Sequence, residues 1–217
     1  MNPVRNQNIK LNEKPKSKKG VSLEISNGVN KKKILFAIFI IFFGVSFRIF
    51  LNKAIAIPNF EAVTSLSLLS GSFLGGIFAP IIPLLIIFLS DLYFGNTAVY
   101  LFTWSAFILV GIFGLLVKRG SKNYFLKITG LGIGSVIFFY LWTNLGWWLT
   151  SGMYPMNLQG LIVCYIAGLP FLKNQLASVL FFAPIFSVLF SLIFNRLSFG
   201  EAKYISHENI TFAAKIS

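Results

Sequence analysis

Asp91 is the residue of this chain that packing explains least well, because it is the only carboxylate between Glu61 and Glu201. An ionised carboxylate at the centre of a membrane helix costs about 3 kcal/mol on insertion scales, so it needs a partner or a purpose. Arg48, near the end of another apolar run, is the nearest candidate partner. We predict a structural salt bridge between Arg48 and Asp91. The alternative is an Asp91 that caps a helix end in the headgroup region while Arg48 snorkels outward.

A second polar group, Asn144, lies in an apolar run that is rich in tryptophan. Its amide offers two donors and an acceptor, which predicts a contact either to another helix or to a ligand. Trp142, Trp147 and Trp148 lie close to it in sequence. Indoles favour the membrane interface, so these residues are also typical of an interfacial belt that marks the end of a helix.

Polar and aromatic residues at the same end of the predicted helices form a candidate site for a small solute. Three connecting segments that are nearly free of basic residues meet at this end. The residues predicted to bind the ligand are Asn59, Asp91, Tyr93, Asn144, Trp147 and Tyr154.

Other reactive groups give little support for catalysis or metal binding. Cys164 is the only cysteine, which excludes an internal disulfide framework, and it is interpreted as a small apolar side chain, with a thiolate ligand to a metal cofactor as the alternative. His207 lies in the C-terminal tail, away from other ligands. A proton relay at Asp91 is disfavoured because no His or second acid accompanies it. The sequence contains no nucleophile–base pair, phosphate loop or HExxH motif, so we expect no enzyme, metal or cofactor.

The composition indicates an integral membrane protein. Of the 217 residues, 56% are hydrophobic and only 12% are charged, whereas soluble domains have about 25% charged residues. The net charge of +13 is uneven, because nine of the 19 Lys and Arg residues lie in the first 33 positions. Basic residues that flank apolar runs indicate orientation in a membrane, so we expect a lipid bilayer as partner and no nucleic acid.

The apolar runs predict six membrane spans with both termini in the cytoplasm. Pro80 and Pro83 divide the run 62–94, and two spans there place the basic loop 118–122 on the same side as the basic N-terminus. The apolar run Leu161–Phe171 is too short to cross and predicts an interfacial or re-entrant segment. The predicted spans are Ile34–Leu51, Ala62–Phe78, Ile81–Phe94, Ala98–Val117, Phe125–Leu149 and Leu176–Phe194.

These spans define the expected domain organisation. Residues 1–33 are predicted to be a disordered basic cytoplasmic tail, 34–195 a six-helix transmembrane domain, and 196–217 a cytoplasmic tail. Small residues allow helix backbones to approach, so glycines four apart predict helix contacts, with a docking face for a partner subunit as the alternative. These glycines are Gly71 and Gly75, and Gly130 and Gly134 with Gly132 between them.

Several of these features occur in an order that resembles a known family. They are Arg48, Pro58-Asn59-Phe60, Ser70-Gly71, Ser90-Asp91-Leu92, Gly95, Thr143-Asn144, Tyr154-Pro155, Cys164-Tyr165 and Pro170-Phe171. Between Arg48 and Phe194 the chain resembles an uncharacterised bacterial membrane-protein family, which is similar to the substrate-binding S components of energy-coupling factor (ECF) vitamin transporters.

The resemblance implies an all-α, S-component-like fold with six transmembrane helices. It also implies capture of a vitamin-like micronutrient at the periplasmic face, with energy supplied by a separate membrane subunit and its ATPases. The sequence departs from the family in two places. S components often dock through an Ala-x-x-x-Ala face, but here Ala37 is followed at that spacing by Ile41. Cys164 does not match the cysteine of cobalamin-specific relatives.

We therefore expect a multi-pass solute-binding or transport subunit of the inner (plasma) membrane. Two other classes are consistent with the composition. One is a structural or scaffold protein of the cell envelope without a ligand. The other is a stand-alone secondary transporter, which the lack of detectable repeat halves disfavours.

Overall fold

The computed structural model describes residues 31–95 and 98–197, and these residues form helices without any strand. The predicted all-helical class is confirmed for this part of the chain. The helices are α1 (Lys31–Ala54), α2 (Val63–Phe73), α3 (Phe78–Phe94), α4 (Tyr100–Phe113), a short 3-10 helix η1 (Gly114–Leu116), α5 (Tyr124–Thr150) and α6 (Leu158–Leu197).

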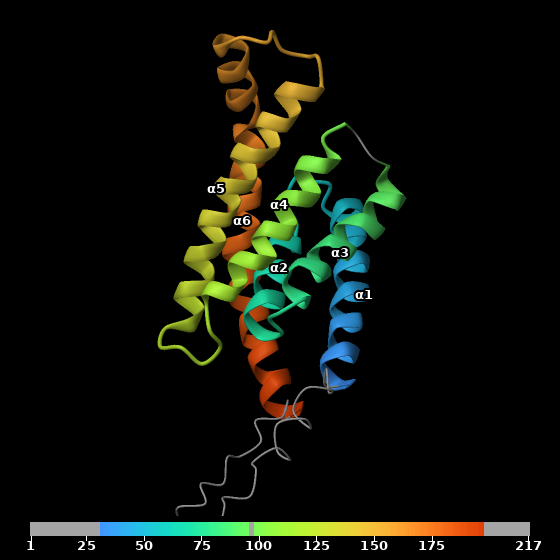
Figure 1. Cartoon of the computed structure of the whole chain (residues 1–217), viewed down its shortest axis with the longest axis vertical. Coiled ribbons are helices and arrows are strands. Elements are labelled where there is room, and N and C mark those ends of the chain that lie inside the picture. Colours follow the sequence, from blue (N-terminus) through green and yellow to red (C-terminus); the bar gives the residue numbers. More distant parts are fainter. Residues whose placement is uncertain (1–30, 96–97, 198–217) are drawn as a thin grey trace, which may run out of the picture.

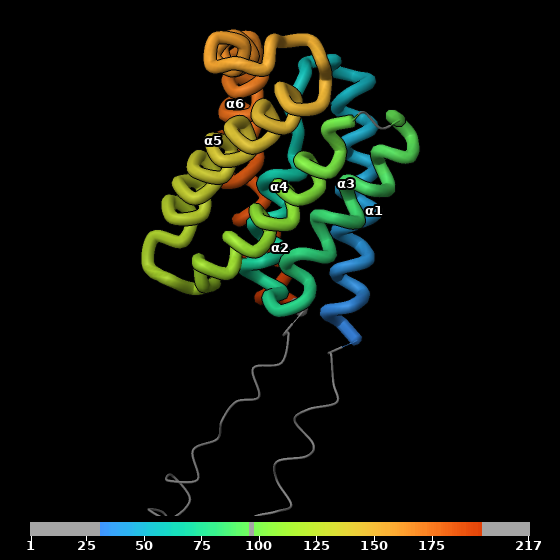
Figure 2. The backbone as a smooth tube through the Cα atoms, turned by 45° about the horizontal axis from the view of Figure 1, so that its top comes forward, coloured from blue at the N-terminus to red at the C-terminus, as the bar shows by residue number. Residues whose placement is uncertain are grey.

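Successive helices run in alternating directions (Figure 1). The start of α1, the α2–α3 and α4–α5 connections and the end of α6 therefore lie at one end of the bundle, and the α1–α2 and α5–α6 connections, the end of α3 and the start of α4 lie at the opposite end (Figures 1 and 2). Helices α1, α5 and α6 are long and apolar enough to cross a membrane, whereas α2, α3 and α4 are shorter apolar helices. The chain is therefore a helical membrane protein, and the six-span topology stays a prediction.

Helix α2 is the centre of the bundle, and ten of its eleven residues are buried. Two of its serine hydroxyls donate to carbonyls one turn back, as in Ser67 Oγ to Val63 O at 2.7 Å, so these polar side chains are satisfied in an apolar environment. Ser65 Oγ, in contrast, is buried without a partner among the described residues. Gly71 lies against α4, where an added Cβ would come within 2.1 Å of Gly111 O. Small residues thus permit the close approach of α2 and α4.

The other predicted glycine contacts are corrected by the structure. Helix α2 ends at Phe73, so Gly75 lies in the following turn with a positive φ of 65° that glycine adopts without strain. Gly130 and Gly134 are exposed on α5, with open space where a Cβ would be added. Gly132 makes the contact instead, because its Cβ would lie 2.8 Å from Val179 of α6.

Helix α6 also departs from the sequence prediction, because Leu161–Phe171 is neither re-entrant nor separate but belongs to one continuous helix of 40 residues. The physical reason is packing against α5. Tyr140 donates to Tyr165 O at 2.5 Å, and Tyr165 donates to Leu141 O at 2.9 Å. At about 1.5 Å per residue the helix is about 60 Å long, which exceeds the thickness of a bilayer.

The predicted tails are shorter than expected where the structure describes them. Lys31, Lys32 and Lys33 form the first turn of α1, and α6 continues to Leu197. The remainder of both tails, including His207, lies outside the described residues.

Between α1 and α6, phenylalanine rings pack edge to face, as in Phe47 and Phe182 with centroids 5.5 Å apart.

Candidate functional site

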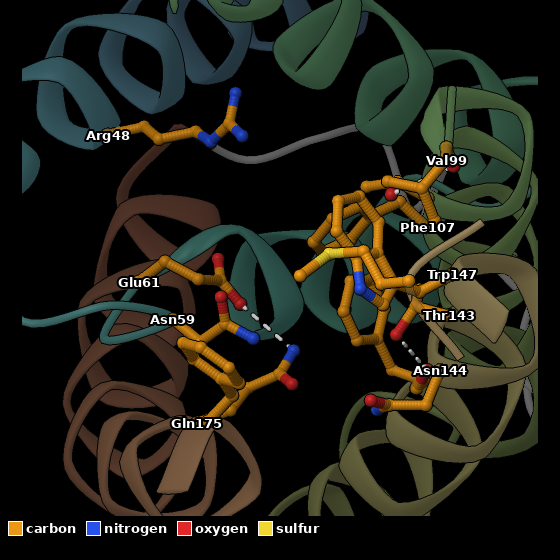
Figure 3. A pocket seen from close by; sticks show the side chains of 13 residues that line it. Arg48, Asn59, Glu61, Val99, Phe107, Thr143, Asn144, Trp147 and Gln175 are labelled. Atoms are coloured by element: carbon orange, nitrogen blue, oxygen red, sulfur yellow. Dashed lines mark hydrogen bonds between the residues drawn. The ribbon is translucent and has the colours of Figure 1, made fainter. Parts of the chain in front are cut away.

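A cavity of about 490 Å³ opens at the end of the bundle opposite the start of α1 (Figure 3). Cavities that bind small molecules usually have about 300–1,000 Å³, so this one fits a vitamin-sized solute. The lining residues are Arg48, Asn59, Glu61, Val99, Thr103, Phe107, Phe139, Thr143, Asn144, Trp147, Met153, Phe171 and Gln175.

The cavity has two different walls. Arg48 of α1, Asn59 and Glu61 of the α1–α2 connection, and Gln175 of α6 lie on one side in Figure 3. On the other side, α4 and α5 contribute aromatic rings together with hydroxyl and amide groups; the labelled residues are Val99, Phe107, Thr143, Asn144 and Trp147. A planar polar solute would therefore meet rings on one face and charged or amide groups on the other.

Arg48 is held in place from outside the cavity. Its Nη1 lies 2.7 Å from Asp91 Oδ1 and also donates to Ser90 Oγ. Trp104 Nε1 donates to the other carboxylate oxygen of Asp91 at 2.8 Å. The guanidinium also lies 5.2 Å from the centre of the Phe94 ring, a favourable cation–π geometry. The pair predicted from the sequence thus joins α1 to α3 and α4 beside the cavity.

Glu61 lies before α2 and its carboxylate accepts hydrogen bonds at the start of that helix. The donors are the backbone N–H groups of Val63 and Thr64 and the hydroxyl of Thr64, which lies 2.5 Å from Oε1. A negative group is favourable at a helix N-terminus. Burial raises the pKa of Glu61 above its usual value, although the hydrogen bonds from Thr64 and the charge of Arg48 oppose the increase.

Gln175 connects this wall to α6 across a large sequence separation. The side chain is 1% exposed. Its Nε2 lies 3.2 Å from Thr64 Oγ1 and 3.5 Å from Glu61 Oε1. An ionised carboxylate can only accept hydrogen bonds, so the NH₂ group of the Gln175 amide, and not its oxygen, points to Glu61.

Asn144 is fixed in a similar way on the opposite wall. Its Nδ2 donates to Tyr140 O at 2.8 Å, one turn back along α5. The neighbouring helix makes room for the amide, because a Cβ added to Gly168 would come within 2.3 Å of Asn144 Oδ1. Cys164 also lies here, with Sγ 3.5 Å from Asn144 O.

Aromatic side chains form the rest of the second wall. The rings of Phe107 and Phe139 have centroids 4.7 Å apart. Trp147 of α5, which is half-buried, lines the cavity with them, whereas the ring of Phe171 belongs to α6, one turn before Gln175. These surfaces suit stacking against a planar ligand.

Three of the six residues that the sequence predicts as ligand contacts line the cavity: Asn59, Asn144 and Trp147. Asp91 is buried behind Arg48 and is not among the lining residues. Tyr93 is 54% exposed, and its ring faces Lys53 Nζ at 5.1 Å rather than the cavity. Tyr154 lies in the α5–α6 connection and does not line the cavity either.

Sequence reasoning missed Glu61 and Gln175. The residues before Glu61 indicate a turn, although a carboxylate just before a helix is also a recognisable capping signal. Gln175 lies directly before the predicted span Leu176–Phe194, where its polar neighbours indicate a loop. The remaining missed residues are Val99, Thr103, Phe107, Phe139, Thr143, Met153 and Phe171.

The described part of the chain contains no group of three or more His, Cys, Asp or Glu residues that could hold a metal ion. The cavity offers hydrogen-bonding groups, aromatic rings and the charges of Arg48 and Glu61. Groups of these kinds hold small molecules in protein pockets by shape and hydrogen bonding.

Comparison with known protein families gives a match. Residues 28–202 match a family that is described as a family of unknown function (DUF6580). The match agrees with the expected uncharacterised family, and nothing in it links the chain to ECF S components. No curated protein and no solved structure matches the chain.

Proposed function

The chain belongs to this family of unknown function, and from its site we propose a membrane-embedded subunit that binds a small, vitamin-like solute. The observation that carries the proposal is the cavity of about 490 Å³, in which the buried amide of Gln175 and the half-buried charged groups of Arg48 and Glu61 face aromatic rings. A purely structural protein has no need of a cavity lined by oriented polar groups, because such groups are normally paired within the protein.

The distribution of charge supports a site that faces away from the cytoplasm. The basic residues Lys118, Arg119 and Lys122 lie in the α4–α5 connection, at the same end as Lys31 and Arg196. Cytoplasmic segments carry an excess of Lys and Arg, so the cavity at the opposite end is directed to the periplasm or the cell exterior. We place the protein in the inner (plasma) membrane with both termini in the cytoplasm.

The resemblance to ECF S components supports a further part of the proposal. In this scheme the chain captures the solute, and a separate membrane subunit with ATPases supplies energy for its release into the cell. The sequence is consistent with this division because it has no phosphate-binding loop of its own.

A thermal unfolding assay tests solute binding. The purified full chain is heated with and without the dialysable small-molecule fraction of a cell extract. A ligand that binds the folded state raises the unfolding temperature. At a hundredfold excess over its Kd it adds about 2.7 kcal/mol to the free energy of unfolding. We expect the extract to stabilise the wild-type protein and Trp148→Ala but not Trp147→Ala.

The two tryptophans form a matched pair on one helix. Trp147 lines the cavity, whereas Trp148 Nε1 donates to Pro155 O at 2.9 Å outside it. Equal stabilisation of both variants would place the ligand elsewhere. Failure of extracts from several growth media to stabilise the wild-type protein would contradict solute binding.

A further inference from the structure

Four polar side chains of the cavity, Gln175, Asn144, Thr143 and Thr103, donate hydrogens to the protein and keep an oxygen that can accept from a ligand. Arg48 and Asn59 also line the cavity, and they keep N–H groups that donate to none of the described residues. Gln175 uses Nε2 for Thr64 Oγ1 and Glu61 Oε1. Its carbonyl oxygen accepts no hydrogen bond from the described residues, although the side chain is 1% exposed and lines the cavity. This oxygen can therefore accept a hydrogen bond from a bound molecule.

The opposite wall repeats the pattern on α5. Asn144 donates Nδ2 to Tyr140 O, and its Oδ1 accepts nothing from the described residues. Thr143 donates its hydroxyl hydrogen to Phe139 O at 2.8 Å, so its oxygen can only accept. Thr103 donates in the same way to Val99 O, at 3.3 Å. Both walls therefore present acceptors to the cavity.

The charged groups do not create a preference for an anion. The guanidinium of Arg48 is paired with the carboxylate of Asp91 at 2.7 Å. Glu61 adds a second carboxyl group at the cavity wall. One cation against two carboxyl groups leaves this set with no net positive charge, whether Glu61 is protonated or not. A ligand carboxylate would therefore bring negative charge next to a carboxyl group and the acceptors of Gln175, Asn144 and Thr143, with only the N–H groups of Arg48, Asn59 and Trp147 in the lining as its donors.

Trp147 adds the one contrasting group on the aromatic wall. Its indole N–H donates to none of the described residues, and an indole N–H can only donate. A ring nitrogen or carbonyl of the ligand would satisfy this donor while the ring stacks on the aromatic wall.

From these positions, and resting on the proposed solute-binding function, we infer that the ligand is an amino-bearing planar heterocycle. Its N–H groups donate to Gln175 Oε1, Asn144 Oδ1 and Thr143 Oγ1, and a ring acceptor meets Trp147. The cavity thus discriminates against the carboxylate of the same ring, because that group has no hydrogen to donate.

Matched pairs of probes test this selectivity on the purified full chain. Tryptamine is compared with indoleacetate, nicotinamide with nicotinate, and benzamidine with benzoate, by native mass spectrometry and thermal shift. We expect binding of the nitrogen-donor member of at least one pair, at least roughly tenfold tighter than its carboxylate. Tighter binding of the carboxylates, equal binding within each pair, or no binding of any probe would overturn the inference.

Two threonine variants test whether the preferred probe donates a hydrogen bond to Thr143. Thr143→Val removes a cavity acceptor and should weaken binding of the preferred probe roughly three- to tenfold, the range of one hydrogen bond. Thr150→Val is the control, because Thr150 makes the same kind of bond to Gly146 O at 2.7 Å but is exposed and outside the cavity. Equal binding by the two variants would contradict the assignment of the donor contact.

Failure of this inference is distinguishable from failure of solute binding. If the cell extract stabilises the protein through Trp147 while the probes favour carboxylates, the solute-binding function stands and the donor-rich ligand class is wrong. If neither extract nor probe binds, both are wrong.

Discussion

Asp91 supports Arg48 from behind the cavity: its Oδ1 lies 2.7 Å from Arg48 Nη1, yet only Arg48 lines the cavity. The lone carboxylate of the apolar region therefore acts on the site through its partner. Trp104 binds the second oxygen of the same carboxylate, so that α1, α3 and α4 meet at one ion pair. This arrangement gives the Asp91 side chain partners within the apolar region and keeps it off the cavity wall.

Replacement of Asp91 by Asn should destabilise the folded protein. The amide keeps the shape of the side chain but leaves the Arg48 guanidinium without a counter-charge, with 22% of its side chain exposed. Because both residues are partly buried, we expect a loss of about 3 kcal/mol in the free energy of unfolding, measured by denaturant titration in mixed micelles. Lys53→Gln is the control, since Lys53 lies over the exposed Tyr93 ring. Equal stability of Asp91→Asn and the wild type would show that the pair is not structural.

Two glycine substitutions should have opposite effects. Gly111→Ala places a Cβ 2.0 Å from Ala79 O, where backbone must move, and should cost about 2 kcal/mol of stability. Gly134→Ala meets open space on α5 and should be neutral or stabilising by up to about 1 kcal/mol, because alanine favours helix. Unfolding temperatures of the two variants measure the difference. Destabilisation by Gly134→Ala of similar size would indicate that its face is covered by a partner.

The fold class and the ion pair were predictable because each depends on local signals. Apolar runs and loop charges indicate membrane helices, and a carboxylate isolated among apolar residues indicates a partner for Asp91. The continuity of α6 was not predictable in this way. Lys173, Asn174 and Gln175 interrupt the apolar pattern, and only packing against α5 shows that the helix continues through them.

The site was predicted in part for a related reason. Asn59, Asn144 and Trp147 are unusual in their own local sequence, so composition alone identifies them. Glu61 and Gln175 are brought together by hydrogen bonds across 114 positions of the chain, and a single sequence contains no signal of that pairing. Tyr93 and Tyr154 have side chains of the expected kind but lie outside the cavity. Whether a residue lines a cavity depends on the direction of its side chain, which the sequence does not give.

The pH dependence of stability should reveal the raised pKa of Glu61. Near its ordinary pKa of 4.5 the unfolded chain loses the proton, whereas burial raises the pKa of Glu61 in the folded state. Between these two pKa values the folded state holds a proton that the unfolded state has lost, so the free energy of unfolding falls as the pH rises. Glu61→Gln lacks this contribution. The stability of the wild type relative to Glu61→Gln should therefore decrease from pH 4.5 upward. A relative stability that rises with pH would contradict the direction of the shift.

Labelling of introduced cysteines should establish which side the cavity faces. Cys164 is 1% exposed, and Cys164→Ala provides a background without a native thiol. In that background, Asn59→Cys should react with a membrane-impermeant maleimide added to intact cells, and Lys122→Cys should react only after the membrane is opened. The positive-inside rule is the reason for this expectation. The reverse labelling pattern would place the cavity in the cytoplasm.

The most direct measurement is native mass spectrometry of the full chain released from its own membrane. The account predicts a small non-lipid adduct on the wild-type protein and on Trp148→Ala, and its loss from Trp147→Ala. Spectra that contain only protein, lipid and detergent, both directly after extraction and after incubation with cell extract, would contradict solute binding by this protein.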